Sequence, residues 1–133
     1  RTVHLVGNIG TPALDVLPSI QPNDIVVYEL SSFQLWDIQY SPHIAVVLMI
    51  EREHLDVHPS MEDYVAAKAR IVHAQNEHDT VIYFHENNYS RSIGEASRGV
   101  KIGYPSQQTT HVQDGWLYNA EQKLCSVSAL SIR

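Results

Sequence analysis

Three things are scarce in this sequence: cysteine, long hydrophobic runs and clustered positive charge. Cys125 is the only cysteine among 133 residues, so no internal disulfide can form, which favours a reducing, cytoplasmic environment. The longest uninterrupted apolar run, Ile44 to Ile50, is far shorter than the roughly 20 residues that span a bilayer. Nine Lys and Arg against fifteen Asp and Glu give a net charge of −6, which argues against binding to a phosphate backbone. We therefore expect neither a membrane nor a nucleic acid as a partner.

Hydrophobic residues, in contrast, are plentiful. They make up 44% of the 133 residues, which is enough for an ordinary core, and the length predicts one domain. The first residue is Arg1 rather than Met, and an apolar segment begins at Val3. We expect the chain to be an excerpt of a longer polypeptide.

The first half of the chain alternates apolar segments with segments that can form helices. Residues Thr2–Val6, Ile25–Leu30 and Ile44–Ile50 are short, β-branched and apolar without alternation, a pattern typical of strands buried on both faces. The pieces between them, Pro12–Ile20 and Ser31–Gln39, are long enough for crossovers and open with helix-start signals. The pattern predicts an α/β fold with a mostly parallel sheet and flanking helices.

The second half continues this alternation and then changes. Ser60 and Asp63 have the spacing of a capping box, which predicts a helix from there to about Gln75. The next expected elements are a strand, a short helix and a strand, at Thr80–Phe84, Asn88–Ser97 and Val100–Tyr104.

The end of the chain has the pattern of a short antiparallel part. Asp114-Gly115 favours a two-residue hairpin turn between the apolar segments on either side. Leu124–Val127 can add a third strand.

Residues able to bind a ligand follow the first three predicted strands. Asn8, Glu29 and His54 would meet at the carboxyl edge of a parallel sheet, where ligands bind in open α/β folds. Each also has a plainer interpretation: Gly7–Gly10 as a strand-to-helix turn, Glu29 as a cap or ion-pair partner, and His54 with Asp56 as exposed loop residues. Neither GxGxxG nor GxxxxGK[ST] occurs, so the sequence carries no dinucleotide fingerprint and no phosphate loop.

Lys68 is the most informative residue of the predicted long helix. Met61, Tyr64, Val65 and Val72 recur at helical spacing, and Lys68 falls on the same stripe, so it faces the core side. Its stem can pack there while the ammonium reaches water. Alternatively, desolvation lowers its pKa and yields a neutral amine that adds carbon dioxide, and the resulting carbamate is an anionic oxygen ligand suited to Mg²⁺.

Four strings carry a specific resemblance. GNIGTPALD, YELSSFQL, EHLDVHP and YVAAKARI, in this order and spacing, resemble the central ATP-binding domain of the Mur ligases. The resemblance is specific from Val6 to Ile71. The string ELSSFQL indicates the branch of the family that adds D-glutamate to UDP-N-acetylmuramoyl-L-alanine.

The resemblance implies an ATP-dependent ligase of peptidoglycan precursor synthesis that forms an amide bond through an acyl phosphate. It implies substrate contacts from Asn8, Ser31 and Gln34. It also implies a Mg²⁺ site formed by Glu29, His54 and carbamylated Lys68, with His54 and Lys68 as catalytic residues.

The chain also departs from the family pattern. Met49 and Glu51 stand where the family usually has Asn and Thr or Ser, and Phe84 aligns with a usual Asn. By the resemblance, the phosphate loop lies upstream of Arg1, and the adenine-side motif and the D-glutamate domain lie downstream of Arg133. We therefore expect this fragment alone to be inactive.

Two other functions remain open at the level of sequence. His54, Asp56 and His58 have ligand types that would suit a metal-dependent hydrolase. A non-catalytic α/β interaction module is the other alternative, and it would bind neither a metal nor a UDP-sugar.

Overall fold

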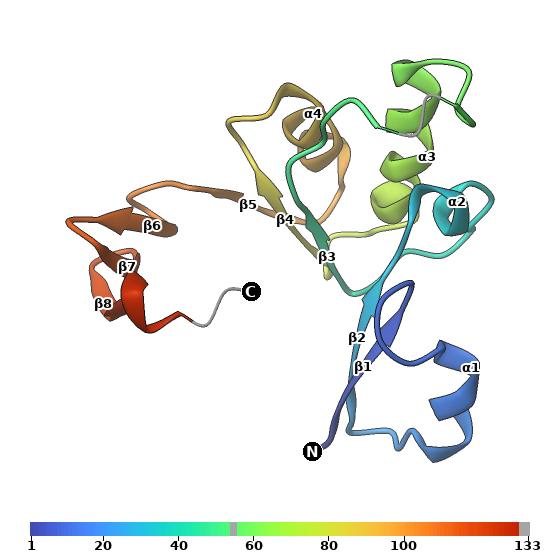
Figure 1. The fold of residues 1–133 in the computed structure, drawn as a ribbon, viewed down its shortest axis with the longest axis horizontal. Helices are drawn as coiled ribbons and strands as arrows, with labels where there is room; N and C mark the ends of the chain where they lie inside the picture. Colours follow the sequence, from blue (N-terminus) through green and yellow to red (C-terminus); the bar gives the residue numbers. More distant parts are fainter. Residues whose placement is uncertain (54–55, 131–133) are drawn as a thin grey trace.

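A computed structural model describes residues 1–53 and 56–130 of the chain and confirms the predicted α/β class (Figure 1). Strands β1 (Val3–Gly7) and β2 (Ile25–Glu29) pair in parallel as a two-stranded sheet. Helix α1 (Ala13–Val16) and a 3-10 turn (Leu17–Ser19) form the crossover between them. The strand predictions for this part are confirmed, and the predicted crossover helix is present but short.

The second sheet has three parallel strands in the order β3-β4-β5. Its strands are β3 (Ile44–Val47), β4 (Thr80–Phe84) and β5 (Val100–Tyr104). Its helices are α2 (Ser32–Leu35), α3 (Met61–His73) and α4 (Asn88–Ala96). The predictions for α3, β4, α4 and β5 are confirmed to within a few residues, whereas α2 is shorter than the predicted Ser31–Gln39.

The hydrophobic core lies on one face of the three-stranded sheet. Ala45 and Val47 of β3 are buried against Tyr64 of α3 and Ile93 of α4, whereas Val46 between them is 50% exposed. Strand β2 is exposed along its whole length. The prediction that the first three strands are buried on both faces is therefore wrong for the described residues. Within residues 1–53 and 56–130, β1 is the only strand paired with the apolar β2, and α3 and α4 pack on a single face of the second sheet.

The third sheet is antiparallel, as predicted. It contains β6 (Thr110–Gln113), β7 (Trp116–Asn119) and β8 (Gln122–Ser126), and a 3-10 turn at Val127–Ala129 follows. Asp114 and Gly115 have φ angles of 49° and 75°, as both central residues of a type I′ hairpin turn must have. In Figure 1 this sheet lies apart from the other two, beyond β5.

The helix-start prediction is half correct. Ser60 caps α3 by accepting a hydrogen bond from the Asp63 N–H at 3.2 Å. The Asp63 side chain does not complete the box, because it pairs with His58 at 2.7 Å. The complete capping box is at α2, where Ser31 and Gln34 bond reciprocally.

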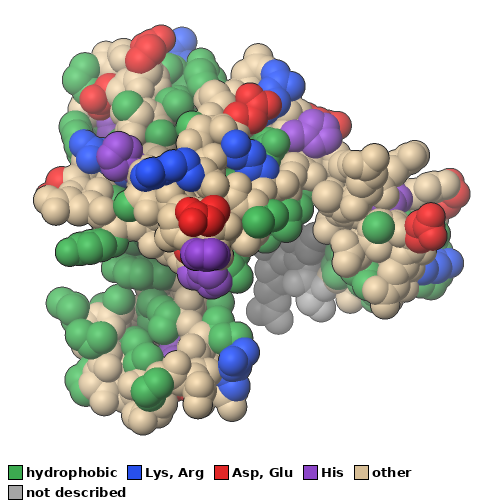
Figure 2. Space-filling view, turned by 180° about the vertical axis from the view of Figure 1, so that it is seen from behind, with side chains coloured by type: hydrophobic (Ala, Val, Ile, Leu, Met, Phe, Trp, Pro, Cys, Tyr) green, Lys and Arg blue, Asp and Glu red, His purple; other side chains and the backbone are tan. Residues whose placement is uncertain are grey.

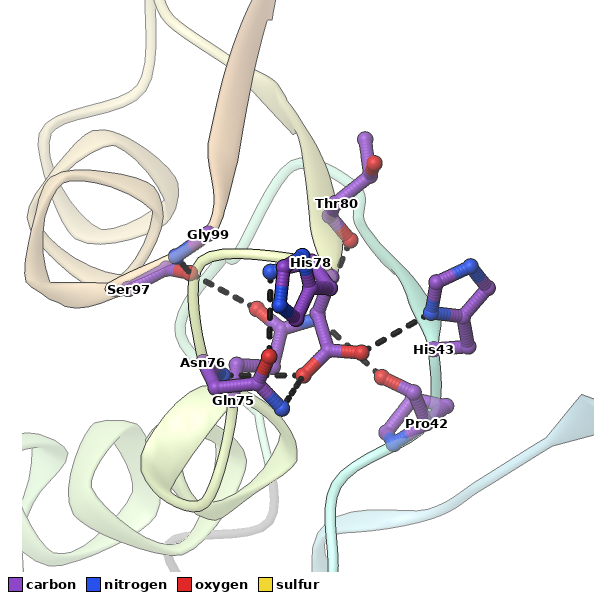
Figure 3. Close-up of polar contacts among 9 residues, drawn as sticks. Pro42, His43, Gln75, Asn76, His78, Thr80, Ser97 and Gly99 are labelled. Carbon is purple, nitrogen blue, oxygen red and sulfur yellow. Dashed lines mark hydrogen bonds and ion pairs between the residues drawn. The ribbon is translucent and has the colours of Figure 1, made fainter.

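One buried glutamine connects the amino ends of the second sheet (Figure 3). Gln75 is fully buried, and its Nε2 donates to the carbonyls of Pro42 at 3.1 Å and Thr80 at 3.0 Å. The Ser97 hydroxyl donates to Gln75 Oε1 at 2.7 Å. This one side chain therefore joins the segments that enter β3, leave α3 and leave α4.

Among residues 1–53 and 56–130, no helix has the length and apolar character needed to cross a bilayer.

Candidate active site

The structure brings Asn8 and Glu29 together at the carboxyl ends of β1 and β2. The Asn8 N–H donates to the Glu29 carbonyl at 3.0 Å, and the Ile9 N–H donates to Glu29 Oε2 at 3.1 Å. Gly7 makes this approach possible: its φ is +131°, and a Cβ there would lie 2.0 Å from the Glu29 carbonyl oxygen. Both side chains are exposed, so the amide and the carboxylate face solvent rather than a closed core.

Ser31 and Gln34 form the next part of the site, just beyond β2. The Ser31 N–H donates to Gln34 Oε1 at 2.9 Å, and the Gln34 N–H donates to Ser31 Oγ at 3.3 Å. These bonds satisfy backbone groups that a helix start leaves without intrahelical partners. They also hold the Gln34 side chain beside Ser31, and Ser31 itself is two residues after Glu29.

Lys68 is half-buried on α3, and its predicted place on the apolar stripe is confirmed. Its Nζ lies 5.0 Å from the centroid of the Tyr64 ring. Burial lowers the pKa of Lys68 below its ordinary value, and the nearby carboxylates of Glu53 and Glu29 oppose this shift. The amine is therefore easier to deprotonate than that of an exposed lysine, yet it remains next to negative charge.

Glu29 and Lys68 line the same cavity, which has a volume of about 430 Å³. It lies between the carboxyl halves of β2 and β3, and its other walls include Leu30, Leu35 and Ile50. A second cavity of about 530 Å³, beside Arg52 and Tyr89, contains none of the predicted site residues. Figure 2 shows hydrophobic side chains gathered over the β1, α1 and β2 part of the molecule.

His54 lies outside the described residues, so its predicted roles stay predictions. His58 is described and buried, and both of its ring nitrogens are engaged: Nδ1 with Asp63 at 2.7 Å and Nε2 with Ser32 Oγ at 3.0 Å. A metal-binding set of His54, Asp56 and His58 is therefore not supported. Sequence analysis missed the buried role of His58, because its contact with Ser32 joins residues 26 positions apart in the chain.

Comparison with known proteins identifies the family. The Mur ligase middle domain matches residues 8–129. UDP-N-acetylmuramoylalanine--D-glutamate ligases are 36% identical along 99% of this chain in Streptococcus equi subsp. zooepidemicus and 34% identical along 99% in Clostridium tetani. The ligase of the same name from Acetivibrio thermocellus is 42% identical along 79% of the chain.

The chain spans 30% of the length of the streptococcal relative and 22% of that of the Acetivibrio relative. The interaction-module alternative finds no support, because these relatives are named as ligases. The order of the four strings agrees with the match over residues 8–129, and the first two strings begin at the carboxyl ends of the paired parallel strands β1 and β2. The chain belongs to the Mur ligase family, within its middle domain.

Proposed function

We propose that this chain is the central part of an ATP-dependent ligase that joins D-glutamate to UDP-N-acetylmuramoyl-L-alanine in the cytoplasm. The observation that carries the proposal is the cavity that Glu29 and Lys68 share at the carboxyl ends of β2 and β3. Ligands bind at that edge in open α/β sheets. The relatives' printed name supports the choice of substrates.

The proposed reaction has two balanced steps. First, the carboxylate of UDP-N-acetylmuramoyl-L-alanine attacks the γ-phosphate of ATP, which gives an acyl phosphate and ADP. The amine of D-glutamate then attacks the acyl carbon, inorganic phosphate leaves, and the nitrogen loses a proton as the amide forms. Both steps depend on alignment of the reacting groups and on stabilisation of developing charge.

Asn8, Ser31 and Gln34 form the substrate side in this proposal. The exposed amide of Asn8 offers a donor and an acceptor beside the Glu29 carboxylate. The capping box holds the Gln34 side chain at the start of α2. These three residues would orient the UDP-muramoyl substrate so that its carboxylate points toward the Lys68 end of the cavity.

The donor set of the cavity fits a magnesium ion. Glu29 offers a carboxylate, and a half-buried Lys68 with a lowered pKa can add carbon dioxide and release a proton to become a second oxygen donor. His54 would complete the set, although imidazole is a less usual ligand for this ion than oxygen. Bound Mg²⁺ would supply neutralisation of charge on the transferring phosphoryl group.

Other parts of a longer ligase would supply the remaining contacts. The 133 residues contain no GxxxxGK[ST] pattern, so we propose that the loop that holds the ATP phosphates precedes this part. The domain that carries D-glutamate would follow it. The chain alone would then hold the muramoyl and magnesium sides of a shared active site.

Lys68 provides the decisive test, in a full-length ligase that contains this chain. We expect the unmodified enzyme to incorporate labelled D-glutamate into UDP-N-acetylmuramoyl-L-alanine and to give a carbamate signal with ¹³C-bicarbonate. Lys68→Ala should lose that signal and most of the activity, because one oxygen donor is gone. The matched control is Lys101→Ala, which removes an exposed lysine of β5. A fully active Lys68→Ala enzyme would refute the role of Lys68, and an unmodified enzyme that does not join D-glutamate would refute the proposed reaction.

A further inference from the structure

His58 has an unusual environment for a histidine in a surface segment. Its side chain is fully buried, and it lies among aromatic rings from α2, from the residue that follows α2, and from α3. The Phe33 and Trp36 rings stack on it with centroids at 5.4 Å and 4.8 Å, and the Tyr64 ring approaches at 5.1 Å and a tilt of 55°. Neither the metal side nor the substrate side of the proposed site uses this residue.

The polar contacts of His58 connect α2 to α3. Nε2 lies 3.0 Å from Oγ of Ser32, the first residue of α2. Nδ1 lies 2.7 Å from Oδ2 of Asp63, in the first turn of α3. Because a carboxylate only accepts, Nδ1 carries a proton and donates to Asp63, while Nε2 shares a hydrogen bond with the Ser32 hydroxyl.

Both helices carry residues of the proposed site close to these contacts. Ser32 directly follows Ser31 and lies two residues before Gln34. Tyr64, which touches His58, also lies under the Lys68 ammonium at 5.0 Å. A continuous set of contacts therefore runs from the substrate residues of α2, through His58, to the lysine of α3.

Helix α2 needs such support from outside itself. It has only four residues, and a helix of this length is not stable alone. Its buried residues are Ser32 and Leu35, so its position depends on a few tertiary contacts. A side chain that is both hydrogen-bonded and stacked fixes the orientation of α2 as well as its distance from α3. Apolar packing alone restricts orientation less, because it is not directional.

We propose that His58 is a positioning residue for the ligase reaction: it sets the location of Ser31 and Gln34 relative to Lys68. The expected effects on KM and kcat rest on the proposed function, whereas the expected effect on the position of α2 does not. In the reaction, the spacing between α2 and α3 determines whether the substrate carboxylate lies in line with the transferring phosphoryl group.

The test compares three variants of a full-length ligase that contains this chain. Ser32→Ala removes the partner of Nε2, and His58→Phe keeps an aromatic ring but removes both polar contacts. The matched control is Ser97→Ala, which removes an equally buried serine hydroxyl at the opposite end of the second sheet, bonded to Gln75 (Figure 3). All three are assayed well below their unfolding temperatures.

We expect Ser32→Ala and His58→Phe to raise the KM for UDP-N-acetylmuramoyl-L-alanine by about five-fold or more and to lower kcat, because each lost hydrogen bond is worth roughly that factor and His58→Phe loses two. The KM for ATP should stay within about two-fold. Ser97→Ala should leave both KM values unchanged. A purely structural role would lower the fraction of active enzyme with every KM unchanged, and that result would overturn the inference.

Hydrogen exchange gives a second readout that does not depend on the reaction. Amides of α2 should exchange faster in Ser32→Ala and His58→Phe than in the unmodified protein, while amides of α4 keep their rates. Unchanged exchange in α2 would overturn the inference even in an active ligase. Faster exchange in α2 of a protein that fails to join D-glutamate would support the positioning role and refute only the proposed reaction.

Discussion

Gly94 lies where α4 packs closely against the Tyr83 ring of β4. A Cβ built there would lie 2.3 Å from two atoms of the Tyr83 ring. Alanine normally favours a helix over glycine by about 1 kcal/mol, but here the added methyl group must displace a ring packed against the core. We expect Gly94→Ala to destabilise the protein by about 1–3 kcal/mol, measured by the shift of the urea midpoint. Ser92→Ala, exposed on the same helix, is the control, and equal midpoints for the two variants would contradict the packing argument.

Gln75 allows a prediction about buried polarity. Gln75→Leu would bury similar volume but leave the Pro42 and Thr80 carbonyls and the Ser97 hydroxyl without this partner. We expect a loss on the order of 3 kcal/mol, because each unsatisfied buried group costs about 1–3 kcal/mol. Urea denaturation measures it, with Gln107→Leu at an exposed position as the control. A loss no larger than that of the control would show that water replaces the lost bonds.

Single residues also show why the positions of some site residues could be predicted from the sequence, whereas the burial of His58 could not. Lys68 was placed correctly because the period of one helix is local information. Asn8 and Glu29 were brought together correctly because parallel strand ends share an edge. The burial of His58 depends on Ser32, which is 26 positions away, and no pattern within a short window encodes that contact.

At the scale of elements, the Asp24 side chain links β1 to the loop before β2 by hydrogen bonds. Its carboxylate accepts from the Thr2 N–H at 2.9 Å and the Gln21 N–H at 3.1 Å, and it bonds to His4 Nε2 at 3.0 Å. The bond to His4, followed by the two backbone bonds, lowers the pKa of Asp24 from its ordinary 3.8 to about 2. A lowered pKa means that the folded state prefers the charged carboxylate, so this contribution is complete above about pH 4.

We therefore expect the pairing of β1 with β2 to weaken as the pH falls from about 4 to about 2, as Asp24 takes up a proton. Backbone NMR signals of the two strands, followed through this range, measure the effect. In Asp24→Asn the strands should be weakened already at neutral pH and should lose this acid dependence. Asp37→Asn, at an exposed position, should keep it. Identical acid profiles in the two variants would show that Asp24 does not control this pairing.

Element types were predictable from the sequence, but their surroundings were not. The run at Ile25–Glu29 forms a strand because β-branched residues favour extended backbone. Its apolar character predicted cover on both faces, yet the described residues place only β1 beside it. An apolar pattern without alternation indicates that both faces of a strand are suited to burial. It does not indicate which segments of the chain cover those faces.

At the scale of the whole molecule, the chain should not turn over ATP by itself. It holds Glu29 and Lys68 but no phosphate-loop pattern, so most of the binding energy for a triphosphate is missing. We expect no ATP hydrolysis and no D-glutamate incorporation from the purified 133-residue chain, measured beside a full-length ligase as positive control. Activity that persists after removal of host ligase would contradict this expectation.

The three sheets differ in how far apart along the chain their paired strands are, and this affects the order in which they can form. Strands β6 and β7 are joined by the turn at Asp114 and Gly115, so their pairing closes a very short loop. Ile44 pairs with Thr80, and all of α3 lies between them. Loop closure must precede non-local pairing, which makes parallel sheets slow to form. The hairpin can therefore form within about microseconds. Strand β3, in contrast, leaves its apolar side chains and unpaired backbone groups exposed until the chain has folded far enough, past α3, for β4 to pair with it.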